Sequence, residues 1–264
     1  MTSYTELLAG LERRADHTID AHIPESWMQG RTTYGGLTAA LSLQAAMELV
    51  DDIPIRSAQV AFVGPVGGDV SIKPKLLRRG KNTAYVSVDV VAGDDVTAQS
   101  IFAFGKAKES AIHFDDMPMP EVRPPEEIEP FFNARGPRPG FTQNFDMLMA
   151  LGGRPISGSK EKSIGLWMRH LDPNTPQDAT AVLAIGDAPP PAVMSMFTEP
   201  LRISSMTWMA EFMTDTITTD PEGWFFAQHT AQLAKDGYSS QSMRLWNRQG
   251  EPILVGRQTI AVFG

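Results

Sequence analysis

The chain has 264 residues, enough for one large domain or two small ones, and 42% of them are hydrophobic while 20% are charged. Its net charge of −8 argues against nucleic acid as a partner, because nucleic-acid binding requires a concentrated basic surface. No apolar run is long enough for a membrane span, and the N-terminal segment lacks the apolar core of a secretory signal, so we expect a cytoplasmic protein.

Cysteine is absent, which removes disulfides, cysteine nucleophiles and thiolate metal sites. The five histidines show no spacing typical of metal ligands, and we interpret each as structural or exposed. The sequence also contains no phosphate-binding glycine loop and no serine-nucleophile motif. We therefore expect neither a metal nor a cofactor.

In chain order, Ser3 and Glu6 form a capping box that predicts a short first helix, and residues 15–23 predict a strand. Residues 35–50 then predict a helix that is apolar nearly all round, which is typical of a buried helix. The helix should end before Pro54, because the residue preceding a proline disfavours helical geometry.

This helix begins at Gly35-Gly36, after Tyr34. Two consecutive glycines cost backbone entropy and suggest a close approach of another group. A ligand oxygen could reach the free N–H groups of the first turn, where the helix dipole favours negative charge. A tight turn between helix and sheet explains the glycines equally well.

The remaining segments divide into two halves. Strands are predicted at 55–63, 70–77, 83–92 and 96–106, then at 141–151 and 163–171, and finally at 203–213, 224–233, 238–247 and 253–263. A second helix is predicted over 176–185, with Pro176 at its first position. Residues 109–140 are rich in proline and glutamate and predict an extended linker laid over the surface. The predicted division is therefore 1–108, 109–140 and 141–264.

Each half places a helix before four strands, and the two halves end on similar residues. Gln99–Gly105 reads QSIFAFG, and Gln258–Gly264 reads QTIAVFG. The agreement of element order with this end motif suggests an internal duplication.

A buried helix that follows a Gly-Gly turn and is wrapped by an antiparallel sheet, present twice in one chain, resembles the double hot-dog acyl-CoA thioesterases of the bacterial thioesterase II type. The resemblance rests on Tyr34-Gly35-Gly36 and residues 58–62 in the first half, and on Thr230, Gly237-Tyr238 and Gln258 in the second. It implies an α+β tandem hot-dog fold, a homodimer or larger assembly, and hydrolysis of fatty acyl-CoA by an oriented water. Tyr34, Gly35 and Gly36 would bind the substrate.

In such enzymes an aspartate, a threonine and a glutamine of the second half hold the attacking water. The resemblance assigns the threonine to Thr230 and the glutamine to Gln258, whereas the aspartate position corresponds to Thr207. Threonine cannot act as a carboxylate base near pH 7. Either the water is only oriented and polarised here, or another acid substitutes, or this member is weak or inactive. The alternative function is a non-catalytic acyl-CoA-binding or regulatory protein of the same fold.

The residues themselves support part of this assignment. Gln258 lies on an otherwise apolar strand face, where a buried amide needs partners; a core glutamine satisfied by backbone, with Gln99 as its twin, is the alternative. Thr230 and Thr207 have the simpler interpretation of ordinary strand threonines. By alternation His229 points away from Thr230, so no dyad is predicted there.

Overall fold

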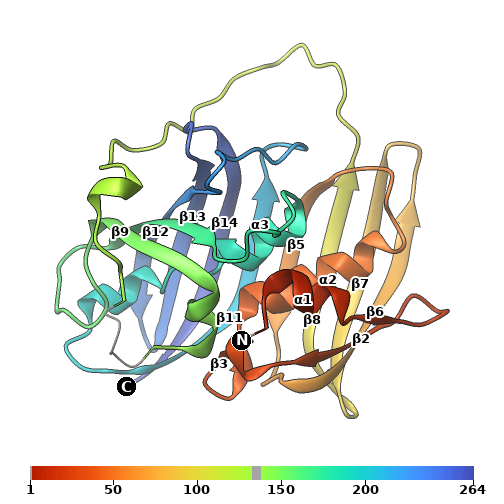
Figure 1. Ribbon diagram of the computed structural model, residues 1–264, viewed down its shortest axis with the longest axis horizontal. Helices are drawn as coiled ribbons and strands as arrows, with labels where there is room; N and C mark the ends of the chain where they lie inside the picture. Colours follow the sequence, from red (N-terminus) through yellow and green to blue (C-terminus); the bar gives the residue numbers. More distant parts are fainter. Residues whose placement is uncertain (1, 133–137) are drawn as a thin grey trace.

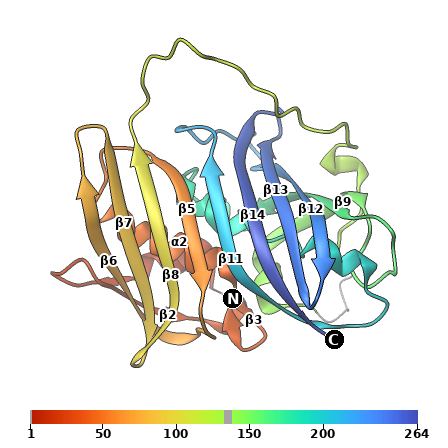
Figure 2. The same cartoon turned by 180° about the vertical axis from the view of Figure 1, so that it is seen from behind.

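The structure, a computed structural model, describes residues 2–132 and 138–264. One antiparallel sheet of twelve strands forms the body of the protein, and the helices pack on one of its faces (Figure 1). Seen from behind, the opposite face of the sheet lies in front of the helices (Figure 2). The strand order is β1-β2-β6-β7-β8-β5-β11-β14-β13-β12-β10-β9.

The strands of this sheet are β1 (Glu12–Arg13), β2 (Ile19–Ile23), β5 (Ile55–Phe62), β6 (Gly68–Arg79), β7 (Thr83–Ala92), β8 (Asp95–Gly105), β9 (Phe145–Gly152), β10 (Ser163–His170), β11 (Arg202–Phe212), β12 (Phe225–Lys235), β13 (Tyr238–Asn247) and β14 (Pro252–Phe263). The helices are α1 (Tyr4–Ala9), α2 (Gly35–Met47) and α3 (Ala179–Gly186). The 3-10 turns are η1 (Glu25–Trp27), η2 (Pro125–Glu127), η3 (Gly140–Asn144) and η4 (Ala192–Met196), and β3 (Met28–Gln29) pairs with β4 (Thr32–Thr33).

The sheet order repeats about its centre, where β5 pairs with β11. On either side of this pair follow the last strand of each half, β8 or β14, then β7 or β13, then β6 or β12. One helix covers each half, and α2 packs against α3. The predicted tandem hot-dog architecture with one continuous sheet is confirmed.

The central helix α2 begins at Gly35 as predicted, and ten of its residues are buried. Its regular part ends at Met47 instead of Val50, because the N–H groups of Glu48, Leu49 and Val50 donate to the carbonyls three residues earlier, which is the pattern of a 3-10 turn. The capping box of α1 is present in full.

The second helix starts later than the sequence suggested. Asp178 is its N-cap, and the carboxylate of Asp178 accepts hydrogen bonds from the N–H groups of Thr180 and Ala181. This side-chain cap fixes the start of α3 at Ala179, so Pro176 lies outside the helix. The predicted strand over 141–151 also begins later, at Phe145, because Gly140–Asn144 forms the turn η3.

Residues 109–132 of the proline-rich segment have little regular structure and arch over one end of the sheet before they return along the second half (Figure 1). Residues 133–137 of the predicted linker lie outside the described part of the chain. Two tryptophans of the outer sheet face hold residues 109–132. The indole of Trp246 donates to the carbonyl of Met117, and that of Trp167 donates to the carbonyl of Arg123. We retain 1–108, 109–140 and 141–264 as a proposed division of the chain. Among the helices in the described residues, none is long and apolar enough to cross a membrane.

Candidate active site

The start of α2 meets the end of α3. Tyr34, the N-cap of α2, provides no side-chain cap, and the N–H of Gly36 donates to the carboxylate of Asp187, the residue that follows α3. A Cβ placed on Gly35 would lie 2.7 Å from Asp187 Oδ2. The close approach predicted from the glycines is therefore present, and the negative group at the helix start belongs to the chain itself.

Gln258 reaches the same carboxylate from β14. Its Nε2 atom donates to Asp187 Oδ1 at 2.9 Å and to Ser205 Oγ at 3.0 Å. The Gln258 side chain is buried, and its partners are other side chains, not the backbone groups that a simple core glutamine would use. The start of α2, the end of α3 and strand β14 thus converge on one carboxylate.

Asp187 is the unusual acid of this cluster. Burial raises the pKa of its carboxyl to about 7, against the opposing hydrogen bonds from Gln258 and from the Gly36 N–H. The residue as a whole is half-buried, so the cluster reaches the surface at this point. A carboxylate with a pKa near 7 can take up and return a proton at neutral pH, which is what general base catalysis requires.

A buried histidine lies behind this cluster. His229 faces inward from β12 and approaches Gln241 of β13, while its ring is also hydrogen-bonded to the backbone of Gly186. Burial lowers the pKa of His229 to about 3, so the ring is neutral at physiological pH. The uncharged ring links β12 to β13 and to the end of α3 through its hydrogen bonds.

The predicted grouping of Thr207 with Gln258 needs correction. A β-bulge at Met206 separates Ser205 from Thr207, so that Ser205 faces the helices and Thr207 is exposed on the other side of the sheet. The residue that meets the Gln258 amide is therefore Ser205. Bulges shift the side-chain alternation by one position and cannot be predicted from the alternation itself.

Thr230 also lies away from Gln258. It projects from the outer face of β12, where its hydroxyl is 2.9 Å from Ser163 Oγ, whereas His229 projects toward the helices. The structure thus does not bring Thr207 and Thr230 together with Gln258. Among the second-half residues expected to hold water, Gln258 alone lies at the start of α2.

Tyr34 is buried beside the glycines. Its ring stacks on Phe141 at 4.0 Å, and its hydroxyl lies where a Cβ on Gly36 would be only 2.5 Å away. Within the described part of the chain this hydroxyl has no hydrogen-bond partner. Burial, reinforced by the charge of Asp187, raises the pKa of Tyr34 well above its usual value, so the phenol remains protonated.

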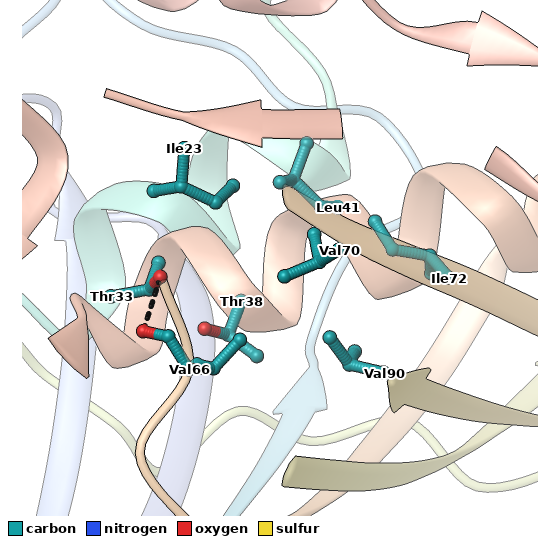
Figure 3. A pocket seen from close by; sticks show the side chains of 8 residues that line it. All are labelled: Ile23, Thr33, Thr38, Leu41, Val66, Val70, Ile72 and Val90. Carbon is teal, nitrogen blue, oxygen red and sulfur yellow. Dashed lines mark hydrogen bonds between the residues drawn. The ribbon is translucent and has the colours of Figure 1, made fainter. Parts of the chain in front are cut away.

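The starts of α2 and α3 differ, and the difference makes the start of α2 the candidate active site. The first N–H groups of α3 are occupied by Asp178 of the same turn, whereas α2 has no such cap and receives Asp187 from the other half. A cavity of about 10 Å³, with room for one water at most, lies between α2 and the first-half strands (Figure 3). A larger cavity of about 460 Å³ lies at the start of α3, with a mixed polar and apolar lining.

Asp187 was not among the residues singled out from the sequence. Its only local signal is position, since it is an acid that directly follows the apolar run of α3. Within the described residues, no group of three or more histidines and acids is placed to hold a metal ion.

Two family sequence models match the chain. One, described as the acyl-CoA thioesterase N-terminal domain, covers residues 23–105, and the other, the acyl-CoA thioesterase C-terminal domain, covers residues 119–262. A search of the curated proteins found no significant match.

Solved structures with the same architecture are similar over nearly their whole length. A hot-dog-fold protein from Alicyclobacillus acidocaldarius is 21% identical, with a TM-score of 0.88 over 100% of this chain and 99% of that one. A putative thioesterase II from Thermobifida fusca is 16% identical, with a TM-score of 0.84 over 100% and 98%. The acyl-CoA thioesterase II TesB2 from Mycobacterium marinum is 18% identical, with a TM-score of 0.77 over 98% of each chain. At these identities the similarity concerns the fold.

Proposed function

Because the chain belongs to the acyl-CoA thioesterase family and is a thioester hydrolase, we propose that it hydrolyses a fatty acyl-CoA by direct attack of a water that Asp187 activates. The observation that carries this proposal is the Asp187 carboxylate, held by the Gly36 N–H and the Gln258 amide at the uncapped start of α2.

In the proposed reaction the ionised Asp187 takes a proton from water as the water oxygen attacks the thioester carbonyl carbon. The carbonyl oxygen becomes an oxyanion, which then re-forms the carbonyl as the carbon–sulfur bond breaks. The departing sulfur of coenzyme A takes the proton back from Asp187. Fatty acid and coenzyme A are the products, and the carboxylate is regenerated.

The thioester would lie at the start of α2, where Asp187 is half-buried and can be reached from the surface. There its carbonyl oxygen would accept from the first-turn N–H groups that Asp187 does not occupy, such as that of Gly35. Donors placed where negative charge develops stabilise the transition state more than the ground state. Gln258 and Ser205 would keep the carboxylate and its water in line with the carbonyl carbon.

A thiol-release assay over acyl-CoAs of graded chain length tests the proposal. We expect turnover by the wild-type protein and a loss of about 10²- to 10⁴-fold in kcat for Asp187→Asn. Asp236→Asn is the matched control, because Asp236 is exposed and its positive φ suits asparagine. Full activity of Asp187→Asn would overturn the site, and tight binding of every acyl-CoA without turnover would favour the non-catalytic acyl-CoA-binding alternative.

A further inference from the structure

The orientation of the Gln258 amide determines whether its NH₂ group or its carbonyl oxygen faces Asp187. Gln258 presents its NH₂ group to Asp187 and Ser205, and its Oε1 atom points to the opposite side. Turned by 180°, the same amide would set a carbonyl oxygen against the carboxylate. An amide side chain can adopt both orientations in the same space, so a neighbouring group must select one.

Gln241 is the group on the opposite side. It lies directly across from Gln258 on the neighbouring strand β13, is completely buried, and donates from Nε2 to Gln258 Oε1 at 2.8 Å. Its own Oε1 accepts from the backbone N–H of Ala192 at 2.9 Å. A backbone N–H can only donate, so Gln241 must turn its oxygen to Ala192 and its NH₂ group to Gln258.

His229 reinforces this direction. Its Nδ1 atom lies 3.4 Å from Gln241 Nε2, and its ring is hydrogen-bonded to the backbone of Gly186. In a neutral ring one nitrogen donates and the other accepts. If the nitrogen on the Gly186 side donates to that carbonyl, Nδ1 is the acceptor and receives the second hydrogen of the Gln241 amide.

The backbone N–H of Ala192, the first donor in this series of hydrogen bonds, is held rigidly. Ala192 follows three consecutive prolines, Pro189 to Pro191, whose rings fix the backbone φ, and it begins the turn η4. The hydrogen bonds then run in one direction from the Ala192 N–H through Gln241 and Gln258 to Asp187. Reversing either amide would leave two oxygens or two NH₂ groups facing each other in the buried core.

We propose that Gln241 is a positioning residue, which fixes the amide of Gln258 with its NH₂ group toward Asp187 and so keeps the carboxylate directed at the attacking water. The inference rests on the proposed function of Asp187 and adds a residue that does not touch the substrate. The series of hydrogen bonds begins at the backbone N–H of Ala192, which cannot rotate out of place as a side chain can.

Gln241→Met tests this inference, because methionine has a similar length and no amide. We expect kcat to fall about 10- to 100-fold with little change in KM, as expected when a reacting group is misplaced. The pH at which kcat/KM reaches half its maximum should rise, because Asp187 loses an aligned donor. The other titratable side chains that face the cluster, Tyr34 from the start of α2 and His229 from β12, are neutral in this range.

A double-variant cycle with Gln258→Met separates positioning from general stability. If Gln241 acts through Gln258, Gln241→Met should cause no further loss of kcat in the Gln258→Met protein. An equal loss in both backgrounds, or wild-type kcat and pH profile in the single variant, would overturn the inference.

Two further variants separate a failure of the proposed function from a failure of this inference. Asp187→Asn, measured in parallel, tests the proposed function alone, and full activity of this variant would show that the site is wrong. If Asp187→Asn is inactive but Gln241→Met has normal activity, only the role of Gln241 is excluded. If Gln241→Met does not fold, Ala192→Pro deletes the anchoring N–H instead, at a first-turn position that tolerates proline. It should show the same loss of kcat, and wild-type kcat in this variant would also overturn the inference.

Discussion

Asp187 lies against Gly35, so the residue that follows α3 fills the space left by the missing side chain of the residue that begins α2. A Cβ on Gly35 would come within 2.7 Å of Asp187 Oδ2 and 3.0 Å of the Phe62 ring. Since α2 belongs to the first half and α3 to the second, the candidate site exists only where the two halves meet.

Gly35→Ala should therefore displace the Asp187 carboxylate. We expect kcat to fall about tenfold or more, because even small displacements of a reacting group are costly. Gly64→Ala is the matched control, since nothing lies within 4 Å of a Cβ at Gly64 and its φ is not positive. Steady-state kinetics of both variants measure this loss of kcat. Wild-type kcat in Gly35→Ala would mean that the position of the Asp187 carboxylate does not depend on this contact.

Local signals in the sequence were sufficient for most of the fold. The apolar helix at Gly35, the capping box at Ser3 and the alternating strands all involve residues near one another in the chain, and these elements are present. The site depends on contacts between distant residues. Nothing near Asp187 in the sequence indicates that α3 ends at the start of α2.

The end motif of the two halves shows why the register of strands was harder to predict. Gln99 and Gln258 lie on corresponding strands, β8 and β14, but Gln99 is exposed on the outer face whereas Gln258 faces the helices. The same reversal separates Ile101, which is 41% exposed, from Ile260, which is 0% exposed. A one-residue difference in register inverts every side chain, so Gln99 is not the structural twin of Gln258.

This inversion makes Gln99 a control for Gln258. Gln258→Ala should lower kcat far more than it raises KM, by about 2–4 kcal/mol in transition-state free energy or on the order of a hundredfold in rate. Gln99→Ala removes an exposed contact to Asp89 and should leave kcat within about twofold of wild type. Equal activities of the two variants would exclude a role of the Gln258 amide in the chemistry.

The bulge at Met206 predicts different effects for aspartate at two neighbouring positions. Thr207→Asp places a solvated carboxylate on the outer face, so hydrolysis should be no faster than in wild type. Ser205→Asp places a second carboxylate beside Gln258, which should raise the pKa of Asp187 and move the rise of kcat/KM to higher pH. A gain of activity in Thr207→Asp would show that position 207 faces the water after all.

The outer sheet face carries apolar side chains that a partner could cover. Tyr85 and Ile101, on the neighbouring strands β7 and β8, are 42% and 41% exposed. We predict a homodimer or larger assembly that includes this face, since exposed apolar patches mark interaction sites and twofold pairs are the commonest assemblies. Light scattering should give at least twice the 28.9 kDa of one chain, and Ile101→Glu should reduce it. A mass near one chain at micromolar concentration would contradict the prediction.

The raised pKa of Asp187 also makes a prediction about stability. Its pKa of about 7 in the folded protein exceeds the ordinary aspartate value of 3.8, so between these values the folded state binds more protons than the unfolded state. The contribution of this group to stability is therefore complete at low pH and is lost as the pH rises from about 4 to 7. At pH 8 the folded protein holds an ionised carboxylate in a buried setting, which is unfavourable.

Asp187→Asn removes that charge and should raise the free energy of unfolding at pH 8 by roughly 1–3 kcal/mol, with a much smaller effect at pH 4.5. Denaturant titrations of both proteins at the two pH values measure the difference. A variant that is less stable than wild type at pH 8 would show that the ionised carboxylate is well solvated or paired in the folded state, and that its affinity for protons is not raised.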